Sequence, residues 1–240
     1  MSKTFLTAEW RKLIMAQYEV SPETLAPWLP VGVQLDLYQG HCYVSLVGFL
    51  FEKVRVKRLA IPFHTHFEEV NLRFYVKRNL PDGTHRRGVV FISEIVPKFA
   101  ITLAARTLYG EAYSTARTRH TWSTTPTTLI ARYDWRHRGQ WQTLSAKASS
   151  QPEPIAPNSL EEFITEHYWG YTRRRNGSTG EYGVEHPRWQ IYPLHSSTVE
   201  ADFGSLYGPA FAHLSHRAPD HVLLAEGSAI AIRTGSHFTA

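Results

Sequence analysis

The sequence of 240 residues is poor in cysteine and has no long apolar run. Its single cysteine, Cys42, excludes an internal disulfide framework and a zinc site built from cysteines. No segment approaches the roughly 18 consecutive apolar residues of a membrane-spanning helix, and residues 1–10 lack the apolar core of a signal peptide. We therefore predict a cytoplasmic protein that makes no membrane contact.

The signature motifs of several large enzyme classes are also absent. The sequence has no Gly-x-Ser-x-Gly nucleophile elbow, no Walker phosphate loop and no Rossmann glycine fingerprint. These absences argue against serine hydrolases, P-loop nucleotide hydrolases and dinucleotide-dependent enzymes. We predict that the protein uses no cofactor.

The charge is moderately positive, with 26 Lys and Arg against 21 Asp and Glu and a formal net charge of +5 at pH 7. Clustered basic side chains can contact the phosphates of a nucleic acid. The clusters here are short, as at residues 53–58 and 173–175, and each lies beside an expected turn or strand end. Solvated turns explain them more simply, so nucleic-acid binding is the weaker alternative.

Apolar and polar residues alternate with a period of two over most of the chain, which predicts strands. The expected strands cover residues 10–20, 33–38, 41–54, 64–78, 88–96, 111–121, 128–137, 140–148, 187–201 and 221–233. Short helices are expected at residues 21–29, 99–109, 158–167 and 205–214. The segments 33–38 and 41–54 should form one β-hairpin, and turns at 79–83 and 176–177 should form two more.

Neither an internal repeat nor a long linker divides the chain, so we expect a single domain spanning residues 1–240. The fold class is α+β and mainly β. A sheet of about ten strands usually curls or closes to manage its edges. The simplest assembly is one large antiparallel sheet with three or four helices outside it.

The segment 67–76 holds the most informative pattern, because the side chains of a strand alternate between two faces. One face is wholly apolar: Val70, Leu72, Phe74 and Val76. The other carries four different polar groups: Glu69, Asn71, Arg73 and Tyr75. If the sheet curls, Arg73 could hold a carboxylate that Glu69 and Asn71 orient. A solvent-facing polar stripe is the alternative, and the alternation alone slightly favours it.

A buried-looking strand ends at Pro97 and delivers Lys98 to the start of an expected helix. The helix dipole and apolar neighbours both favour the neutral amine, which can attack a ketone to form a Schiff base. Lowering a lysine pKa from about 10.4 to about 7 needs about 4.6 kcal/mol, whereas a helix terminus supplies about 0.3–1 kcal/mol. Burial or another cation must supply the rest, and a surface lysine at a strand end is the favoured alternative.

His64, His66 and Glu68 would lie on one strand face, and such His-x-His pairs bind zinc or iron. The same face continues into apolar packing, so we predict no metal and keep this site as an alternative. An expected helix carries three more candidates without a zinc-binding spacing, Glu162, Glu166 and His167. A solvated or packed role explains these three better. His186 should pack or hydrogen-bond near the wall of the sheet, with pocket lining as the second choice.

Several motifs together resemble the acetoacetate decarboxylase-like superfamily, and more closely a group of uncharacterised bacterial proteins in it, the YqjF-like family. The most specific is the Glu-x-Asn-x-Arg-x-Tyr-Val run at residues 69–76. The weaker ones are Trp10, residues 25–30, residues 35–36, residues 44–49, residues 105–106 with 109–110, and residues 186–189. The resemblance implies a cone-like, partly closed antiparallel β-barrel with flanking helices, an interior pocket and an oligomer. It also turns the face of Glu69, Asn71 and Arg73 toward that pocket.

Acetoacetate decarboxylase carries its Schiff-base lysine in a Glu…Pro-Lys-Lys run, and the run Glu94…Pro97-Lys98-Phe99 is similar to it. The resemblance therefore implies that Lys98 forms the imine. The chain departs from the pattern at Phe99, which replaces the second, cationic lysine, and the spacing from Glu94 is shorter. Desolvation and the helix terminus are then left to activate Lys98.

Together these patterns predict a protein that binds a small carboxylate or ketone in a barrel pocket. In the catalytic form of this hypothesis, a Schiff-base β-keto acid decarboxylase, Lys98 and Glu69 do the chemistry. The expected ligand-binding residues are Arg73, Asn71, Tyr75, Glu94, Arg106 and His186. The alternative is a non-catalytic ligand-binding or sensing protein on the same fold, in which Lys98 is structural.

Overall fold

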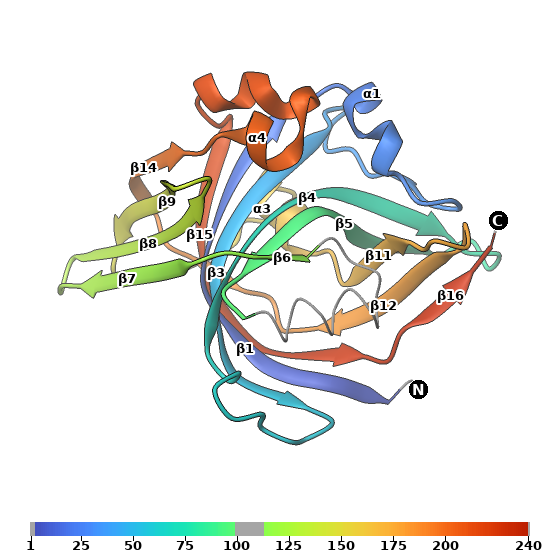
Figure 1. Cartoon of the computed structure of the whole chain (residues 1–240), viewed down its shortest axis with the longest axis horizontal. Helices are drawn as coiled ribbons and strands as arrows, with labels where there is room; N and C mark the ends of the chain where they lie inside the picture. Colours follow the sequence, from blue (N-terminus) through green and yellow to red (C-terminus); the bar gives the residue numbers. More distant parts are fainter. Residues whose placement is uncertain (1–2, 99–112, 240) are drawn as a thin grey trace.

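The computed structural model describes residues 3–98 and 113–239. Seven strands in these ranges form a closed ring, in which each strand is hydrogen-bonded to the next. In ring order they are β15 (His221–Arg233), β1 (Thr4–Glu19), β3 (Tyr43–Val56), β4 (Phe67–Asn79), β5 (His85–Val96), β11 (Trp169–Arg173) and β12 (Thr179–Glu185). The ring closes where β12 pairs with β15, with Val184 opposite Ile232 (Figure 1). Closure removes the open edges that a flat sheet of this size would expose.

Shorter strands extend the ring. They are β2 (Gln34–Leu35), β6 (Tyr113–Thr115), β10 (Glu153–Pro154), β13 (Gln190–Ile191) and β16 (Ser236–Phe238). Among the described strands, β5 pairs in parallel with both β6 and β11, and the other pairings of the ring are antiparallel. The expected antiparallel sheet is therefore the main motif, and parallel pairing enters only at β5 in this part of the chain.

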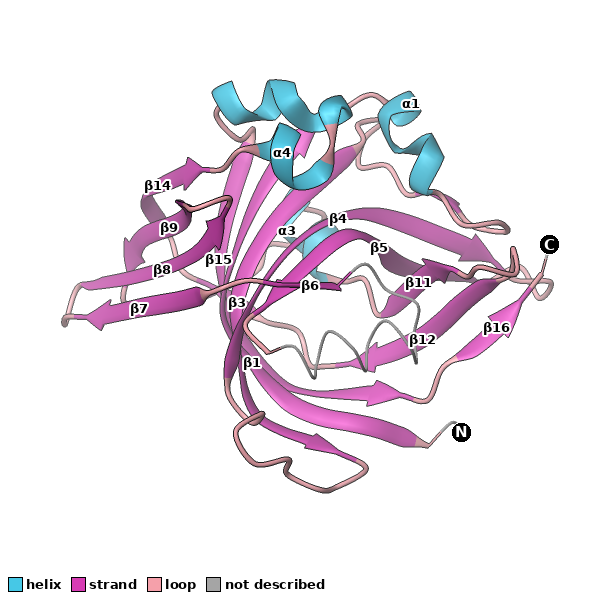
Figure 2. Ribbon diagram, in the orientation of Figure 1, coloured by secondary structure: helices cyan, strands magenta, loops and turns pink. Residues whose placement is uncertain are grey.

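A second, four-stranded sheet packs against the outside of the ring (Figure 2). Its strands are, in order, β14 (Leu194–Glu200), β9 (Gln140–Ser149), β8 (Thr128–His137) and β7 (Thr118–Thr124). Tyr133 and Leu144 of this sheet share one hydrophobic core with Leu46 of β3 and Leu72 of β4. Gly48 of β3 permits the close approach, because a Cβ there would lie 3.1 Å from Tyr133 and 3.3 Å from Leu144.

Short helices pack on the two sheets. They are α1 (Pro22–Leu25), the 3-10 helix η1 (Ala26–Trp28), α3 (Leu160–Thr165), α4 (Phe203–Tyr207) and the 3-10 helix η2 (Pro209–His216). Phe211 of η2 is buried in the core between the sheets, and Phe163 of α3 is buried in the core inside the ring. Ser159 caps the N-terminus of α3, because its Oγ accepts a hydrogen bond from the backbone N–H of Glu162 at 3.1 Å. No helix in the described ranges combines the length and the apolarity needed to span a bilayer.

The predicted hairpin between residues 33–38 and 41–54 is wrong. β2 pairs with β4, with Gln34 opposite Lys77, and only an isolated bridge joins the two predicted partners. β3 instead lies between β1 and β4. Because β3 starts short of the last residues of β4, that edge of β4 is left for β2 to pair with.

Some of the other predicted strands are confirmed and one is wrong. The strands expected at 128–137, 140–148 and 221–233 are confirmed as β8, β9 and β15, with bounds that differ by one residue at most. The single strand expected at 187–201 is wrong, because it divides into β13 and β14, which belong to different sheets. Pro193 lies between them and has no N–H to continue a ladder. The helix expected at 99–109 lies outside the described residues.

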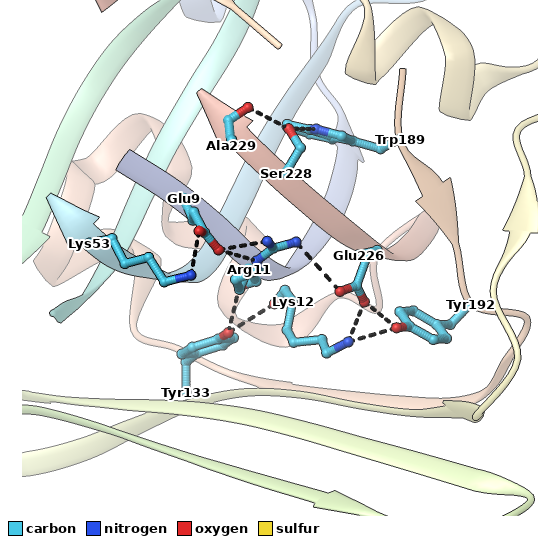
Figure 3. A network of polar contacts seen from close by, with 10 residues as sticks. All are labelled: Glu9, Arg11, Lys12, Lys53, Tyr133, Trp189, Tyr192, Glu226, Ser228 and Ala229. Carbon is cyan, nitrogen blue, oxygen red and sulfur yellow. Dashed lines mark hydrogen bonds and ion pairs between the residues drawn. The ribbon is translucent and has the colours of Figure 1, made fainter. Parts of the chain in front are cut away.

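A bulge in β1 organises a polar network on the outside of the ring (Figure 3). Lys12 has a φ of 52°, and the register between β1 and β3 shifts just after Arg11. Lys12 and the Tyr192 hydroxyl both donate hydrogen bonds to Glu226. Arg11 forms ion pairs with Glu9 at 2.6 Å and with Glu226 at 3.7 Å. We call Glu9, Arg11, Lys12, Tyr192 and Glu226 the outer network, in which every charge faces an opposite one.

Candidate functional site

The inner face of β4 is the polar face predicted from the sequence. Its side chains belong to Glu69, Asn71, Arg73 and Tyr75, whose exposed fractions are 3%, 1%, 8% and 1%. Val70 and Leu72 point the other way, into the core beneath the second sheet. The alternation with a period of two is therefore confirmed. The alternative of a solvent-facing stripe is wrong, because closure of the ring takes this face out of bulk water.

Cross-strand pairing brings two more polar side chains to Glu69. Asn71 lies opposite Glu94 of β5, and Glu94 lies opposite Tyr113 of β6. Asn71 donates from Nδ2 to Glu69 Oε1 at 2.9 Å, and the Tyr113 hydroxyl donates to Glu69 Oε2 at 3.1 Å. Glu94 is 1% exposed, so two buried carboxyl groups share one side of the ring.

A bulge in β5 adds Phe91 to the same side. The register between β4 and β5 shifts at Arg73, which lies opposite Phe91, and Ile92 is the extra residue. Ile92 packs outward beneath the second sheet. The extra residue reverses the alternation, so that Phe91 and Glu94 both face inward although three positions separate them.

A cavity of about 300 Å³ lies inside the ring against this face. Much of its wall is aromatic or aliphatic, including Trp10, Phe51, Phe91, Trp169, Val184 and Trp189. The polar residues in its wall are His64, Glu69, Arg73, Glu94, Tyr113, Thr165, His167, Tyr182 and His186. This volume is at the small end of ligand pockets, and a mostly apolar wall with a few polar groups is typical of sites for small molecules.

Arg73 is a buried cation in the wall of this cavity. Its Nη2 lies 3.7 Å from the sulfur of Met15, and its Nε has no hydrogen-bond partner within residues 3–98 and 113–239. Among the residues that the structure describes, no carboxylate forms an ion pair with Arg73. A buried charge without a counter-charge is strongly unfavourable. Arg73 is therefore the group best suited to hold an anion in the cavity.

Burial opposes the ionisation of the Glu69 carboxyl group. Burial raises the pKa of the Glu69 carboxyl to about 7, although the hydrogen bonds from Asn71 and Tyr113 and the charge of Arg73 act in the opposite direction. Near neutral pH, Glu69 therefore exists in both protonation states. A group poised in this way can accept a proton and return it.

His167 belongs to the cavity wall and was not identified as a site residue from the sequence. α3 ends at Thr165, so His167 lies beyond the helix that was expected to carry it. Its ring packs against the rings of Tyr75 and Phe163, with centroids 4.8 Å and 5.0 Å away. The packed role expected for His167 holds, but its hydrogen-bond partner Asp36 is 131 residues away in the chain, beyond the reach of any local pattern.

Asp36, directly after β2, ties His167 to β5. Its Oδ2 accepts hydrogen bonds from Arg87 Nε at 2.7 Å and from His167 Nε2 at 3.2 Å. Burial opposes the ionisation of Asp36, but the hydrogen bonds from His167 and Arg87 outweigh it and lower the pKa of this carboxyl. Burial lowers the pKa of His167 to about 4, so its ring is neutral at pH 7.

A comparison with protein families matches residues 7–229 to DUF2071, described as "Uncharacterized conserved protein". The chain belongs to this family. It is also 25% identical over 183 residues to YqjF, an uncharacterised protein of Bacillus subtilis strain 168, and the match covers 76% of this chain and 73% of YqjF. The relationship to YqjF-like proteins predicted from the sequence is thereby confirmed.

Solved structures with the fold of this DUF2071 protein include acetoacetate decarboxylase-like enzymes. Acetoacetate decarboxylase of Legionella pneumophila gives a TM-score of 0.66 at 12% identity, covering 98% of this chain and 87% of that one. An acetoacetate decarboxylase-like enzyme of Sphingomonas wittichii gives 0.65 at 11% identity, covering 99% and 94%. The enduracididine biosynthesis enzyme MppR, in complex with pyruvate, gives 0.64 at 12% identity, covering 99% and 91%. At such identities the likeness shows the fold alone, and it confirms the predicted acetoacetate decarboxylase-like fold.

The remaining predicted site residues of the DUF2071 chain have different locations. Lys98 follows β5 by two residues and is half-buried, but it is not among the described residues that line the cavity. Arg106 lies outside the described residues. His186 lines the cavity and stacks on Trp189, with ring centroids 4.3 Å apart, while its Nδ1 donates to the Pro187 carbonyl at 2.9 Å. An imine-forming role for Lys98 stays a prediction.

Two predicted ligand-binding residues, Asn71 and Tyr75, lie behind the lining of the cavity. Neither is among the described residues that line it. Asn71 supports Glu69, and the Tyr75 hydroxyl lies 2.5 Å from Ser45 Oγ, which in turn donates to Gln17. These two side chains are placed to position the lining residues rather than to touch a ligand.

His64, His66 and Glu68, the residues of the alternative metal site, are not brought together as a group of ligands. The His64 Nδ1 donates to the Pro62 carbonyl at 2.8 Å. Glu68 accepts from the Thr118 hydroxyl at 2.6 Å, on the side of β4 that faces the second sheet. Within residues 3–98 and 113–239, no three His, Cys, Asp or Glu side chains come together as metal ligands.

Proposed function

We propose that the cavity binds a small molecule that carries a carboxylate group, and that Arg73 is the partner of that group. The observation that carries the proposal is the burial of Arg73 in the cavity wall without an ion pair among the described residues. A carboxylate in the cavity would take up the free donors of the guanidinium. It would also offset the electrostatic penalty of burying a cation that has no ion pair.

The rest of the wall supports a ligand with an apolar body. Trp10, Phe51 and Phe91 present aromatic surface to the cavity, and such surface buries flat apolar groups well. The pyruvate complex of MppR, which has the same fold, makes a keto acid a sensible first probe for this chain. A 2-keto acid with an aromatic body, such as phenylpyruvate, has both a carboxylate for Arg73 and an apolar group for the aromatic wall.

Thermal unfolding in the presence of phenylpyruvate or acetoacetate tests the proposal. We expect a saturable rise in Tm with ligand concentration, because a ligand that binds only the folded state stabilises it by mass action. Arg73→Met should abolish the rise. Arg11→Met, the matched arginine of the outer network, should retain it. The proposal fails if no carboxylate raises the Tm of the wild type, or if Arg73→Met binds with unchanged Kd.

A Schiff-base step by Lys98 is the second candidate, and the raised pKa of Glu69 favours it, because such a step needs a group that moves a proton. The Lys98 amine would add to the ketone of a β-keto acid and expel one water. The bond to the carboxylate would then break, carbon dioxide would leave, and the electron pair would pass into the protonated imine to give an enamine. Glu69 would return a proton to carbon, and one water would release the ketone from Lys98.

Borohydride trapping with acetoacetate separates the catalytic from the non-catalytic form. Reduction of an imine leaves a covalent adduct on the lysine, which intact mass spectrometry detects. The adduct should disappear in Lys98→Ala and persist in Lys147→Ala, a control at an exposed position of β9. The imine step is ruled out if the wild type forms no adduct, or if the adduct persists in Lys98→Ala. Ligand stabilisation that survives Lys98→Ala then identifies a binding or sensing protein.

A further inference from the structure

A surface cleft of about 950 Å³ lies at the end of the ring where β1 begins (Figure 1). Phe5 and Tyr182 line both this cleft and the inner cavity, so the two spaces adjoin at these residues. Among the described residues, Arg73 lines the inner cavity and not the cleft. The cleft is therefore a separate place for a ligand to bind.

Four basic side chains line the cleft: Lys3, Lys57, Arg58 and Arg174. Lys3 precedes β1, residues 57–58 directly follow β3, and Arg174 directly follows β11. The sequence analysis treated the basic clusters at 53–58 and 173–175 as separate, solvated turns. The closed ring brings part of each cluster to the same cleft, next to the N-terminal end of β1. We call the space lined by these four side chains the basic cleft.

Acids of the described chain do not balance the charge of the basic cleft. None of its four cations forms an ion pair within residues 3–98 and 113–239. Glu181 is the one acid among the described lining residues, and it already accepts hydrogen bonds from Arg78 and Arg86 at 2.8 Å each. A cleft lined by charge of one sign raises the local concentration of ions of the opposite sign. The basic cleft therefore attracts anions.

The turn after β3 has an unusual composition for its backbone conformation. Val56 and Leu59 exchange two backbone hydrogen bonds of 2.9 Å. Lys57 and Arg58 are thus the central residues of a two-residue turn, and their φ angles are 48° and 71°. Asn and Gly are the usual residues at such positions, because a positive φ is unfavourable for most side chains. Non-glycine residues held at positive φ are enriched where a protein clamps a ligand, and an anion in the cleft would explain these two.

Backbone hydrogen bonds hold the segments of the basic cleft together. The N–H of Lys57 donates to the Phe5 carbonyl at 2.8 Å, which joins the turn to β1. The N–H of Thr234, just after β15, donates to the Lys3 carbonyl at 2.8 Å. Arg174 belongs to the turn between β11 and β12. The cations therefore extend from ordered backbone on different sides of one cleft, an arrangement that suits a compact ligand.

We propose that the basic cleft binds a small molecule that carries a diphosphate group. Its volume lies at the upper end of the range for pockets that bind small molecules. Arginine engages phosphate oxygens through its planar fork and lysine acts as a point charge, so a diphosphate can contact cations from more than one segment. A single carboxylate would leave most of the positive charge unbalanced. The inference goes beyond the proposed function, because it does not involve Arg73.

Isothermal titration calorimetry with inorganic pyrophosphate at low ionic strength tests the proposal. We expect saturable binding that is tighter than the binding of inorganic phosphate. Replacing Lys57→Gln and Arg58→Gln together should weaken it by about 10-fold or more, because hydrogen bonds to charged groups are lost. The matched control, Arg136→Gln with Arg138→Gln at the β8–β9 hairpin, removes the same charge and should retain the affinity. Arg138 also has a positive φ, of 46°.

Backbone amide NMR locates the ligand independently. Pyrophosphate should shift the signals of Gly180 and Gly235, which line the cleft, and leave the signal of Gly139 at the β8–β9 turn unchanged. Arg174→Gln removes a cation from a different segment and should also weaken binding. The result then does not depend on the folding of one variant.

The outcomes separate this inference from the proposed function. The inference is overturned if pyrophosphate does not bind, if the control pair weakens binding as much, or if the shifts fall elsewhere. A DNA duplex that binds more tightly than pyrophosphate, and that loses affinity in the same variants, would instead identify a nucleic acid as the occupant. Loss of pyrophosphate binding in Arg73→Met would assign the anion to the inner cavity. Lys57→Gln with Arg58→Gln should keep the rise in Tm with phenylpyruvate, which would show that the two sites are separate.

Discussion

Two polar clusters on the same ring use similar side chains but pair their charges differently. In the outer network, Arg11 and Lys12 each face a carboxylate, and their side chains are 28% and 17% exposed. Inside the ring, Arg73 is 8% exposed and has no ion pair within the described part of the chain. An arginine that is paired and hydrated contributes to the stability of the fold, whereas we propose that an arginine that is buried without an ion pair serves to bind a ligand.

The two arrangements differ in free energy as well. A partly exposed ion pair contributes about 0–1 kcal/mol to stability. A buried charge without an ion pair has the opposite effect, because its lost hydration is replaced only in part, here by the contact with the Met15 sulfur and by the charge of Glu69 when that group is ionised. A chain that keeps Arg73 where it is gives up stability, and ligand binding is the reason that we propose for it.

The largest expected effect comes from the pH dependence that Glu69 gives to stability. Its pKa is about 7 in the folded protein against a model value of 4.5, so the folded state holds this proton more tightly than the unfolded state does. Between these values the folded state binds more protons, so the contribution of Glu69 to the free energy of unfolding falls as pH rises, by about 3 kcal/mol in all. His167, whose pKa burial lowers to about 4, contributes in the opposite direction and is common to the wild type and the variant. The difference in the free energy of unfolding between the wild type and Glu69→Gln should therefore fall from pH 5 to pH 8, which urea denaturation measures.

Glu9 of the outer network supplies the control for that measurement. Hydrogen bonds from Lys53 and Arg11 lower the pKa of Glu9, so its contribution is present above its unfolded pKa and is lost as pH falls through the folded value. Glu9→Gln should leave the slope between pH 5 and pH 8 as it is. A wild-type slope in Glu69→Gln would show that the inner carboxyl is not protonated in the way described.

Replacing each of the two arginines, Arg73 and Arg11, by methionine should change the free energy of unfolding by a smaller amount, and in opposite directions. Without ligand, Arg73→Met should keep the free energy of unfolding level or raise it by about 1 kcal/mol, because it replaces a lone buried charge with an apolar side chain. Arg11→Met should lower it by about 1 kcal/mol or less. Chemical denaturation of both variants makes the comparison. A loss of about 3 kcal/mol or more in Arg73→Met would mean that this guanidinium has a counter-charge in solution.

The smallest expected effect belongs to Glu226. Glu226→Gln keeps an oxygen that accepts from Lys12 and Tyr192, so the variant should lose only about 0.5 kcal/mol, and 1 M salt should erase most of the difference. Thermal unfolding at low and high salt provides the measurement. A loss that salt does not change would place Glu226 among the buried groups and would weaken the contrast between the two clusters.

The sequence predicted the fold where alternation within one strand carries the information. β4 and β15 are long, strongly patterned strands, and both were found close to their true bounds. The errors arise where the choice of partner decides the outcome. β2 was assigned to its neighbour in the chain, but it pairs with β4, and nothing within residues 33–38 encodes that choice.

Within the candidate site, too, the sequence predicted the residues that share one strand and missed those that depend on pairing between distant segments. Glu69 and Arg73 were predicted because they lie four residues apart on one strand, and therefore on the same face of it. Phe91 faces the cavity because of a bulge in β5, and the alternation of apolar and polar residues does not predict that bulge. The pairing of His167 with Asp36 depends on two segments that only the closed ring brings together. Sequence patterns therefore identify the strand that carries Glu69 and Arg73, and the structure adds the groups that surround them.

A crystal structure of the protein with phenylpyruvate tests most directly whether Arg73 binds a carboxylate. We expect a carboxylate oxygen of the ligand within about 3 Å of the Arg73 guanidinium, with the phenyl ring against the aromatic wall. The proposal is contradicted if the ligand occupies another part of the molecule while Arg73 forms an ion pair with a carboxylate of its own chain.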